Sequence, residues 1–145
     1  MDKKVLHTLE FDKILQLLSE RAAFSVGKSR ALELLPTASL RQAQRWQEET
    51  AQAKAVIEEH GPPPFGGLRD VRDDVGRTLV GAVLYPDQLL AIADTVRGCE
   101  RLRDFLLERA PQVQAEIVED LAGMIGKFRD IEREITRCID TEGRV

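Results

Sequence analysis

The segment at residues 62–70 reads PPPFGGLRD, and the sequence on either side of it has the periodicity of helices. A phosphate-binding P-loop follows the pattern G-x-x-x-x-G-K-S/T, because its lysine and hydroxyl must reach phosphate and metal. Here the glycines are followed by Leu-Arg-Asp, and the Rossmann pattern G-x-G-x-x-G is also missing. Prolines stiffen a chain, and glycines accept backbone angles that other residues resist. We therefore predict a Pro/Gly elbow over residues 61–67, in which Phe65 fills the core. The elbow residues are Pro64, Phe65, Gly66 and Gly67.

Apolar residues recur at helical spacing along most of the 145-residue chain. Hydrophobic residues make up 43% of the chain but aromatic residues only 5%, so a core would consist mainly of Leu, Ile, Val and Ala. Because strands draw on aromatic and β-branched residues, this composition favours helices over a sandwich or a barrel. We predict an all-α fold of packed, antiparallel helices that forms a single domain over residues 1–145.

The sequence before the elbow predicts a series of helices with clear start and stop signals. Ser25 is placed to cap the second helix, and Pro36 stops it, since proline cannot continue a helix. The third helix begins at a capping-box pattern, SLRQ at residues 39–42, and runs to about His60. The apolar face of the first helix holds Phe11, Ile14, Leu15, Leu18 and Ala22. The residues that the third helix is expected to bury are Leu40, Ala43, Trp46, Ala53 and Ile57.

The sequence after the elbow predicts further helices. The first of them is short and is closed by Gly81, and Pro86 is placed as the first residue of the next. Pro111 marks another helix start. The apolar faces consist of Val71, Val75 and Leu79, then Leu89, Ile92, Val96, Cys99, Leu102 and Leu106, then Val113, Ile117, Leu121 and Ile125, and finally Phe128, Ile131, Ile135 and Ile139.

The formal net charge of -4 disfavours autonomous nucleic-acid binding, because an acidic domain gains nothing from counterion release. A local basic face could still give weak, salt-sensitive contact, and its candidates are Lys28, Arg30, Arg41 and Arg45. The chain has no apolar signal segment and no stretch near the roughly 18 apolar residues that span a bilayer. We therefore expect a cytoplasmic protein with no membrane contact.

No catalytic, cofactor or metal site can be assembled from the sequence. Cys99 and Cys138 stand far apart, which favours two apolar thiols in a reducing compartment over a metal or redox pair. His7 and His60 have no partner at catalytic or ligand spacing, which is typical of histidines at helix ends or on the surface. We expect no enzymatic activity from this chain.

Several motifs in fixed order resemble the beginning of MutS-family proteins. They are TLEFDKI at residues 8–14, SVGKSRALELLPTASL at 25–40, PFGGLRDV at 64–71, LYPDQLLAIADTVRGCERLRDFL at 84–106 and DIEREITRCIDTEGRV at 130–145. The chain is most similar to the second bacterial MutS subfamily, which lacks the mismatch-recognition domain and carries a C-terminal Smr nuclease domain. Tyr85 departs from the small polar residue that the family places before the proline. Because tyrosine is a poor N-cap, we expect other groups to satisfy that helix start.

The resemblance implies an N-terminal core/lever region whose ATPase and Smr domains lie outside this chain, and the final IDTEGRV is typical of a chain that continues. It further implies a parent that uses ATP and Mg²⁺, forms a homodimer, and acts on branched DNA to suppress recombination, on collided ribosomes through their rRNA, or on both. The lever would transmit the ATPase state without chemistry of its own. The alternative is a free-standing helical module that binds protein or nucleic acid. For self-association, the candidate uncovered apolar residues are Leu102, Leu106, Ile135 and Ile139.

Overall fold

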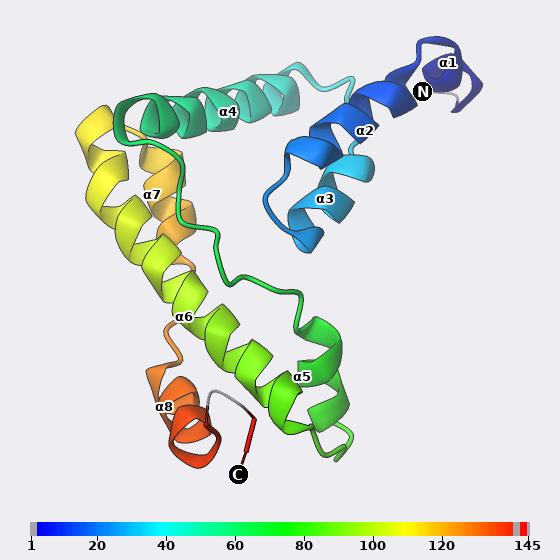
Figure 1. The fold of residues 1–145 in the computed structure, drawn as a ribbon. Coiled ribbons are helices and arrows are strands. Elements are labelled where there is room, and N and C mark those ends of the chain that lie inside the picture. The colour runs from blue at the N-terminus through cyan, green and yellow to red at the C-terminus, as the bar shows by residue number, and fades with distance from the viewer. Residues whose placement is uncertain (1–2, 141–142, 145) are drawn as a thin grey trace. The chain divides into compact units, whose positions relative to one another are not determined.

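The computed structural model describes residues 3–140 and 143–144. Within those residues the secondary structure consists of α-helices and one 3₁₀ helix, and no strand is present (Figure 1). The prediction of an all-α fold of packed helices is thereby confirmed. The chain groups into two compact units, Met1–Gln44 and Arg45–Val145. We describe each unit by itself, and the single domain stays a prediction.

The first unit contains α1 (Lys3–Thr8), α2 (Phe11–Arg21), α3 (Ser25–Leu32) and the first residues of α4 (Leu40–His60). α2 and α3 pack against each other, and their buried residues include Ser19 and Ala31. Ser25 was expected to cap α3, but it is the first helical residue, and the extended Phe24 takes the cap position instead. Phe24 is half-buried, so burial of the apolar ring accounts for this shift of one residue.

Both ends of α4 follow local signals. Ser39 Oγ accepts a hydrogen bond from the backbone N–H of Gln42 at 3.3 Å, which is one half of the predicted capping box. The helix ends at His60, and Gly61 follows with a φ of 81° while its N–H bonds to the carbonyl of Ile57 at 2.9 Å. A glycine in this left-handed conformation commonly ends a helix, because it has no Cβ to clash.

The buried face of α4 differs from the expected one. Val56 is only 1% exposed, whereas Leu40, Trp46 and Ile57 are 73%, 39% and 47% exposed. Successive helical residues point about 100° apart, so burying Val56 turns its neighbour Ile57 outward. Apolar residues lie on both sides of α4, and the packing partner selects between them. The prediction was wrong because the sequence of α4 alone does not identify that partner.

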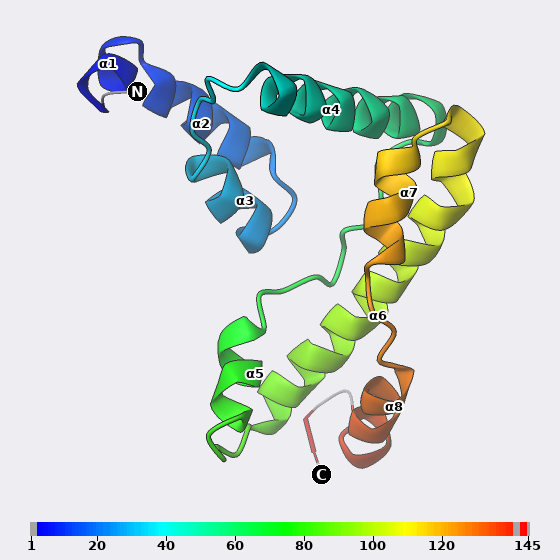
Figure 2. The same cartoon turned by 180° about the vertical axis from the view of Figure 1, so that it is seen from behind.

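The second unit is built around α6 (Pro86–Arg109), a helix of 24 residues. The 3₁₀ helix η1 (Ala110–Val113), α7 (Glu116–Gly123) and α8 (Arg129–Cys138) pack against α6, and α5 (Arg72–Thr78) precedes it (Figures 1 and 2). The core lies at the C-terminal end of α6. Its buried residues are Val56, Ala110, Ala115 and Val118, and Phe105, Leu106 and Val113 pack around them.

The two predicted proline starts have different outcomes. Pro86 is the first residue of α6, as expected. Pro111 instead lies inside the 3₁₀ turn, and α7 begins only at Glu116, after Gln114 has adopted a left-handed φ of 57°. A proline lacks the N–H that a longer helix would use, so it also suits a tight turn that reverses the chain between α6 and α7.

The start of α6 is satisfied by a neighbouring side chain, as the resemblance led us to expect. Gln88 Oε1 accepts a hydrogen bond from the N–H of Tyr85 at 2.9 Å. The amide of Gln88 also donates to Asp74 Oδ1 on α5 at 2.5 Å. Gln88 therefore caps α6 and joins it to α5.

Candidate functional site

A crossing formed by residues 61–71 runs along α6 between α4 and α5 (Figure 1). The carbonyl of Gly66 accepts a hydrogen bond from Arg101 Nη2 at 2.9 Å. The N–H of Arg69 donates to Thr95 Oγ1 at 3.2 Å. As the crossing advances from Gly66 to Arg69, its partners on α6 move back from Arg101 to Thr95. The crossing is therefore antiparallel to α6 and bonded to it at two points.

Gly98 allows the crossing to lie close to α6. A Cβ added at Gly98 would stand 2.8 Å from Leu68 Cδ2 and 3.3 Å from the carbonyl oxygen of Gly66. Gly67 has a φ of 87°, and a Cβ there would lie 3.6 Å from the carbonyl oxygen of Asp94. Glycine is thus required on both sides of the contact, on α6 for space and in the crossing for its backbone conformation.

The four predicted elbow residues lie in this crossing. Pro64 and Phe65 are half-buried, and Gly66 and Gly67 are exposed. The N–H of Phe65 bonds to the carbonyl of Pro63 at 2.9 Å, and the N–H of Leu68 bonds to the carbonyl of Phe65 at 3.3 Å. The second turn contains Gly66, whose carbonyl bonds to Arg101 on α6. That the four residues act as a rigid elbow stays a prediction.

An apolar groove of about 350 Å³ lies beside the crossing, between α5, α6 and α8. Its lining residues are Val71, Val75, Ile92, Thr95, Val96, Cys99, Ile125, Gly126, Phe128 and Ile131. Burial raises the pKa of the Cys99 thiol, because the thiolate is poorly solvated there. The sequence predicted the apolar character of most of these residues, but it did not predict that they leave a groove open between helices.

The charged residues next to the groove are paired with one another. Arg129 Nε lies 2.5 Å from Glu100 Oε1, and Arg97 Nη2 lies 2.6 Å from Glu132 Oε1. The hydrogen bond to Glu132 raises the pKa of the Arg97 guanidinium. At the other wall, the hydrogen bond from the side chain of Arg72 lowers the pKa of Asp70 to about 2.

The predicted basic residues Lys28 and Arg30 lie on α3, and Arg41 and Arg45 lie on α4, all of them exposed. Lys28 and Arg30 are two residues apart on a helix, so their side chains leave it in roughly opposite directions. Arg45 Nε is paired with Glu49 Oε1 at 2.9 Å. Nucleic-acid contact by these residues stays a prediction.

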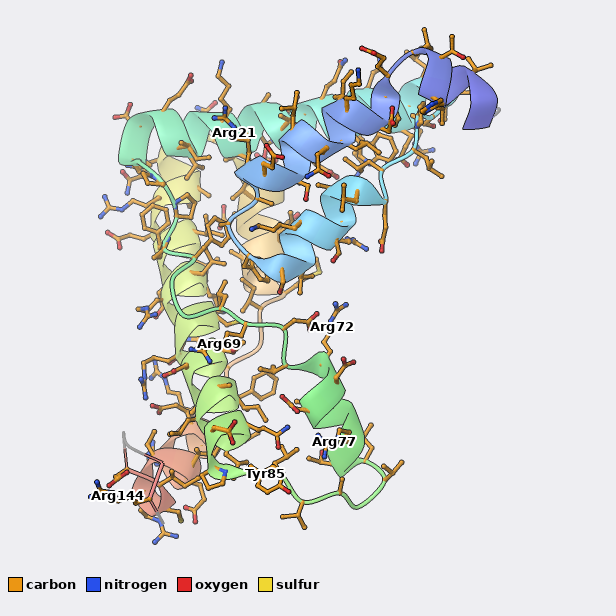
Figure 3. The ribbon with its side chains drawn as sticks, turned by 45° about the vertical axis from the view of Figure 1, so that its right-hand side comes forward. Arg21, Arg69, Arg72, Arg77, Tyr85 and Arg144 are labelled. Atoms are coloured by element: carbon orange, nitrogen blue, oxygen red, sulfur yellow. The ribbon has the colours of Figure 1, made fainter. Side chains whose placement is uncertain are left out.

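Sequence reasoning did not single out the basic residues that follow the elbow. Figure 3 shows Arg69 in the crossing and Arg72 and Arg77 on α5. The signal was present in the sequence RDVRDDVGR at residues 69–77, where arginines alternate with aspartates. Arg72 pairs with Asp70 at 2.6 Å, and Arg77 lies 3.8 Å from Asp74. Two of the three arginines are thus neutralised within the segment.

The residues predicted to form an uncovered apolar surface are mostly packed. Leu102 and Ile139 are 9% and 6% exposed, and Leu106 and Ile135 are half-buried. That prediction was wrong, because the inward face of α6 and the end of α8 pack within the second unit. The exposed apolar side chains include instead Leu79, Val80, Val83 and Tyr85, which lie between α5 and α6 or at the start of α6. Self-association stays a prediction, and Leu102 and Ile139 are buried away from any such contact.

Within residues 3–140 and 143–144, no three His, Cys, Asp or Glu side chains are placed to hold a metal ion. His7 Nδ1 lies 3.4 Å from Asp12 Oδ2 at the exposed start of α2. None of the described helices combines the length and the apolarity needed to cross a bilayer.

The fold defines an all-helical segment. Its groove and its closest backbone contact lie where α5, α6, α8 and the crossing meet. No protein-family model matches the chain. A protein of Brevibacillus brevis named endonuclease MutS2 is 39% identical over 145 residues, which is 100% of this chain and 18% of that relative. The endonuclease MutS2 of Symbiobacterium thermophilum is also 39% identical over 145 residues, with the same shares. That of a Geobacillus species is 35% identical over 148 residues, covering 100% of this chain and 19% of the relative.

The chain belongs to the MutS2 family, which confirms the resemblance stated above. It spans less than a fifth of the length of these relatives, since the shares are 18% and 19%.

Proposed function

We propose that this chain is the N-terminal core/lever segment of a MutS2-type protein, and that it transmits the state of an ATPase elsewhere in the polypeptide without chemistry of its own. One observation carries the proposal: the whole chain matches proteins named endonuclease MutS2, of which it spans 18%. For the longer protein we propose a cytoplasmic homodimer that uses ATP and Mg²⁺ and acts on branched DNA or on ribosomes.

The geometry of the second unit supports a transmitting role. α6 has 24 residues, so it is about 36 Å long at about 1.5 Å per residue. At its C-terminal end Val56 of α4 packs among core residues that include Phe105. At its N-terminal end Gln88 bonds to α5. The crossing is bonded to α6 between these two ends, so a displacement at one end is carried along a supported helix.

The experiment compares the 145-residue chain with the longer protein encoded by its gene. We expect no ATP hydrolysis and no DNA cleavage from the isolated chain. In the longer protein, Gly98→Ala should weaken the stimulation of ATP hydrolysis by branched DNA or ribosomes and leave the basal rate unchanged. Gly76→Ala is the matched control, because nothing lies within 4 Å of a Cβ at that position.

Three outcomes would contradict the proposal in whole or in part. The first is turnover that follows the 145-residue chain through purification to a single peak. The second is a gene that encodes only these residues, which would favour the free-standing helical module. Unchanged coupling in Gly98→Ala, with the crossing shown to be displaced, would remove the transmitting role and leave the family assignment intact.

A further inference from the structure

The groove between α5, α6 and α8 exposes an apolar surface in the second unit. It is lined by ten residues, of which only Thr95 has a polar side chain besides the Cys99 thiol. The wall residues Phe128 and Ile131 are 54% and 51% exposed. Apolar surface of this kind, surrounded by polar residues, is typical of a contact site.

We propose that an amphipathic helix from the part of the MutS2-type polypeptide outside these 145 residues packs into this groove. The inference rests on the proposed function, since it requires the longer protein. The relatives matched over the full length of this chain have more than four-fifths of their own length outside the matched segment, because that segment is 18% of them. In a protein of that length, a large amount of chain is covalently attached and available to cover the groove.

The shape of the groove fits a helix. Its floor is the face of α6 that carries Ile92, Val96 and Cys99, and its walls are α5 and α8. A helix lying between two helices on a third places apolar side chains at spacings of three and four residues into the gap. A volume of about 350 Å³ accommodates a few such side chains and not a whole folded domain.

The charges around the groove indicate the chemistry of the occupant. Ion pairs stand on both sides of the groove, Arg129–Glu100 at α8 and Arg72–Asp70 at α5, and charges paired in this way offer little to a strongly charged partner. Arg97–Glu132 is paired in the same way. The groove therefore selects its partner by apolar contact, which distinguishes the proposed helix from a nucleic acid or an acidic peptide.

The two cysteines of the chain allow a direct test. Cys99 lines the groove, and Cys138 is exposed at the end of α8 and does not line it. We would treat the 145-residue chain and the longer protein with N-ethylmaleimide and follow each cysteine in its own peptide by mass spectrometry. We expect Cys99 to react at least about tenfold more slowly in the longer protein, because reaction then requires local opening of the groove. Cys138 serves as the internal reference.

A matched pair of variants makes the test specific. Ile131 and Leu121 are 51% and 52% exposed, but only Ile131 lines the groove. Ile131→Glu should leave the unfolding midpoint of the 145-residue chain unchanged. In the longer protein it should return Cys99 labelling toward the rate in the isolated chain. Leu121→Glu should change neither result.

Each remaining outcome overturns the inference. If Cys99 reacts equally fast in both proteins, the groove is open and nothing packs there. If protection appears in the isolated chain and grows with its concentration, the occupant is a second copy. If branched DNA or ribosomes stimulate ATP hydrolysis in the longer protein while Cys99 reacts as fast as in the 145-residue chain, the groove inference fails and the proposed function stands. A gene that ends at Val145 removes both.

Discussion

Replacing Gly98 with alanine places a methyl group between α6 and the crossing. The new Cβ would stand 2.8 Å from Leu68 Cδ2, which is closer than real Cβ contacts allow. It would also stand 3.3 Å from the carbonyl oxygen of Gly66, which already accepts the hydrogen bond from Arg101. The end of the Leu68 side chain can turn away, but the carbonyl belongs to the backbone and moves only with the crossing.

Two effects of opposite sign determine the change in stability. Alanine in place of glycine inside a helix stabilises by up to about 1 kcal/mol, because glycine loses more backbone entropy on folding. Inserting a methyl group into a close contact destabilises by about 1–3 kcal/mol. Because part of the strain falls on the backbone of the crossing, we expect the second effect to exceed the first. The net loss in the free energy of unfolding should be about 1 kcal/mol.

Urea unfolding followed by circular dichroism measures this change in the 145-residue chain. Gly76→Ala on α5 is the control, since its Cβ would meet nothing within 4 Å and it should stabilise by about 0.5–1 kcal/mol. In the double variant Gly98→Ala/Leu68→Ala the contact with Leu68 Cδ2 is removed and the contact with the Gly66 carbonyl remains, so the two substitutions should couple favourably by less than about 1 kcal/mol. The reasoning would be refuted if Gly98→Ala stabilised the chain as much as Gly76→Ala does, because the crossing could not then lie against Gly98.

Three further substitutions test the packing of α4 and the ion pair between Arg72 and Asp70. Val56→Ala should cost about 2 kcal/mol in urea unfolding, because Val56 is 1% exposed. Ile57→Ala should cost less than about 1 kcal/mol, because Ile57 is 47% exposed. If Ile57→Ala cost more than Val56→Ala, the face of α4 predicted from the sequence would be the buried one. Arg72→Ala should raise the pKa of Asp70 from about 2 toward its ordinary 3.8, measured by NMR titration of the carboxyl. Because this pKa is lowered in the folded state, the Asp70 contribution to stability is present above about pH 4 and is lost as the pH falls toward 2. In Arg72→Ala that pH-dependent part should disappear, and an unchanged titration would show that the pair does not form.

The sequence predicted the helix boundaries best, because these depend on local chemistry. Ser39 caps α4 and Pro86 begins α6, whereas α5 ends at Thr78, before the predicted stop at Gly81. Each signal acts through the hydrogen bonds or the backbone angles of its own segment, so no knowledge of the tertiary structure is needed.

The contacts between segments could not be predicted in the same way. Val56 and Ile57 are both apolar and adjacent, and only the position of the core decides which one is buried. Gly98 lies inside a helix where glycine is unfavourable, which is a sequence signal for a close approach, but its partner Leu68 is 30 residues earlier in the chain. The groove was beyond prediction for the same reason, because it depends on the distance that α5 and α8 keep across α6.

The crossing and the groove share residues, which connects the proposed function to the proposed helix contact. Thr95 accepts the hydrogen bond that fixes Arg69, and it also lines the groove. Val71 lines the groove as well and directly follows the Asp70 that Arg72 holds. A helix packed in the groove would therefore touch the side chain that anchors the crossing. Movement of that helix would reach the crossing through Thr95 and, along α6, the core at the C-terminal end of that helix. The groove at the N-terminal half of α6 would thus receive the displacement, and α6 would carry it toward the core around Val56.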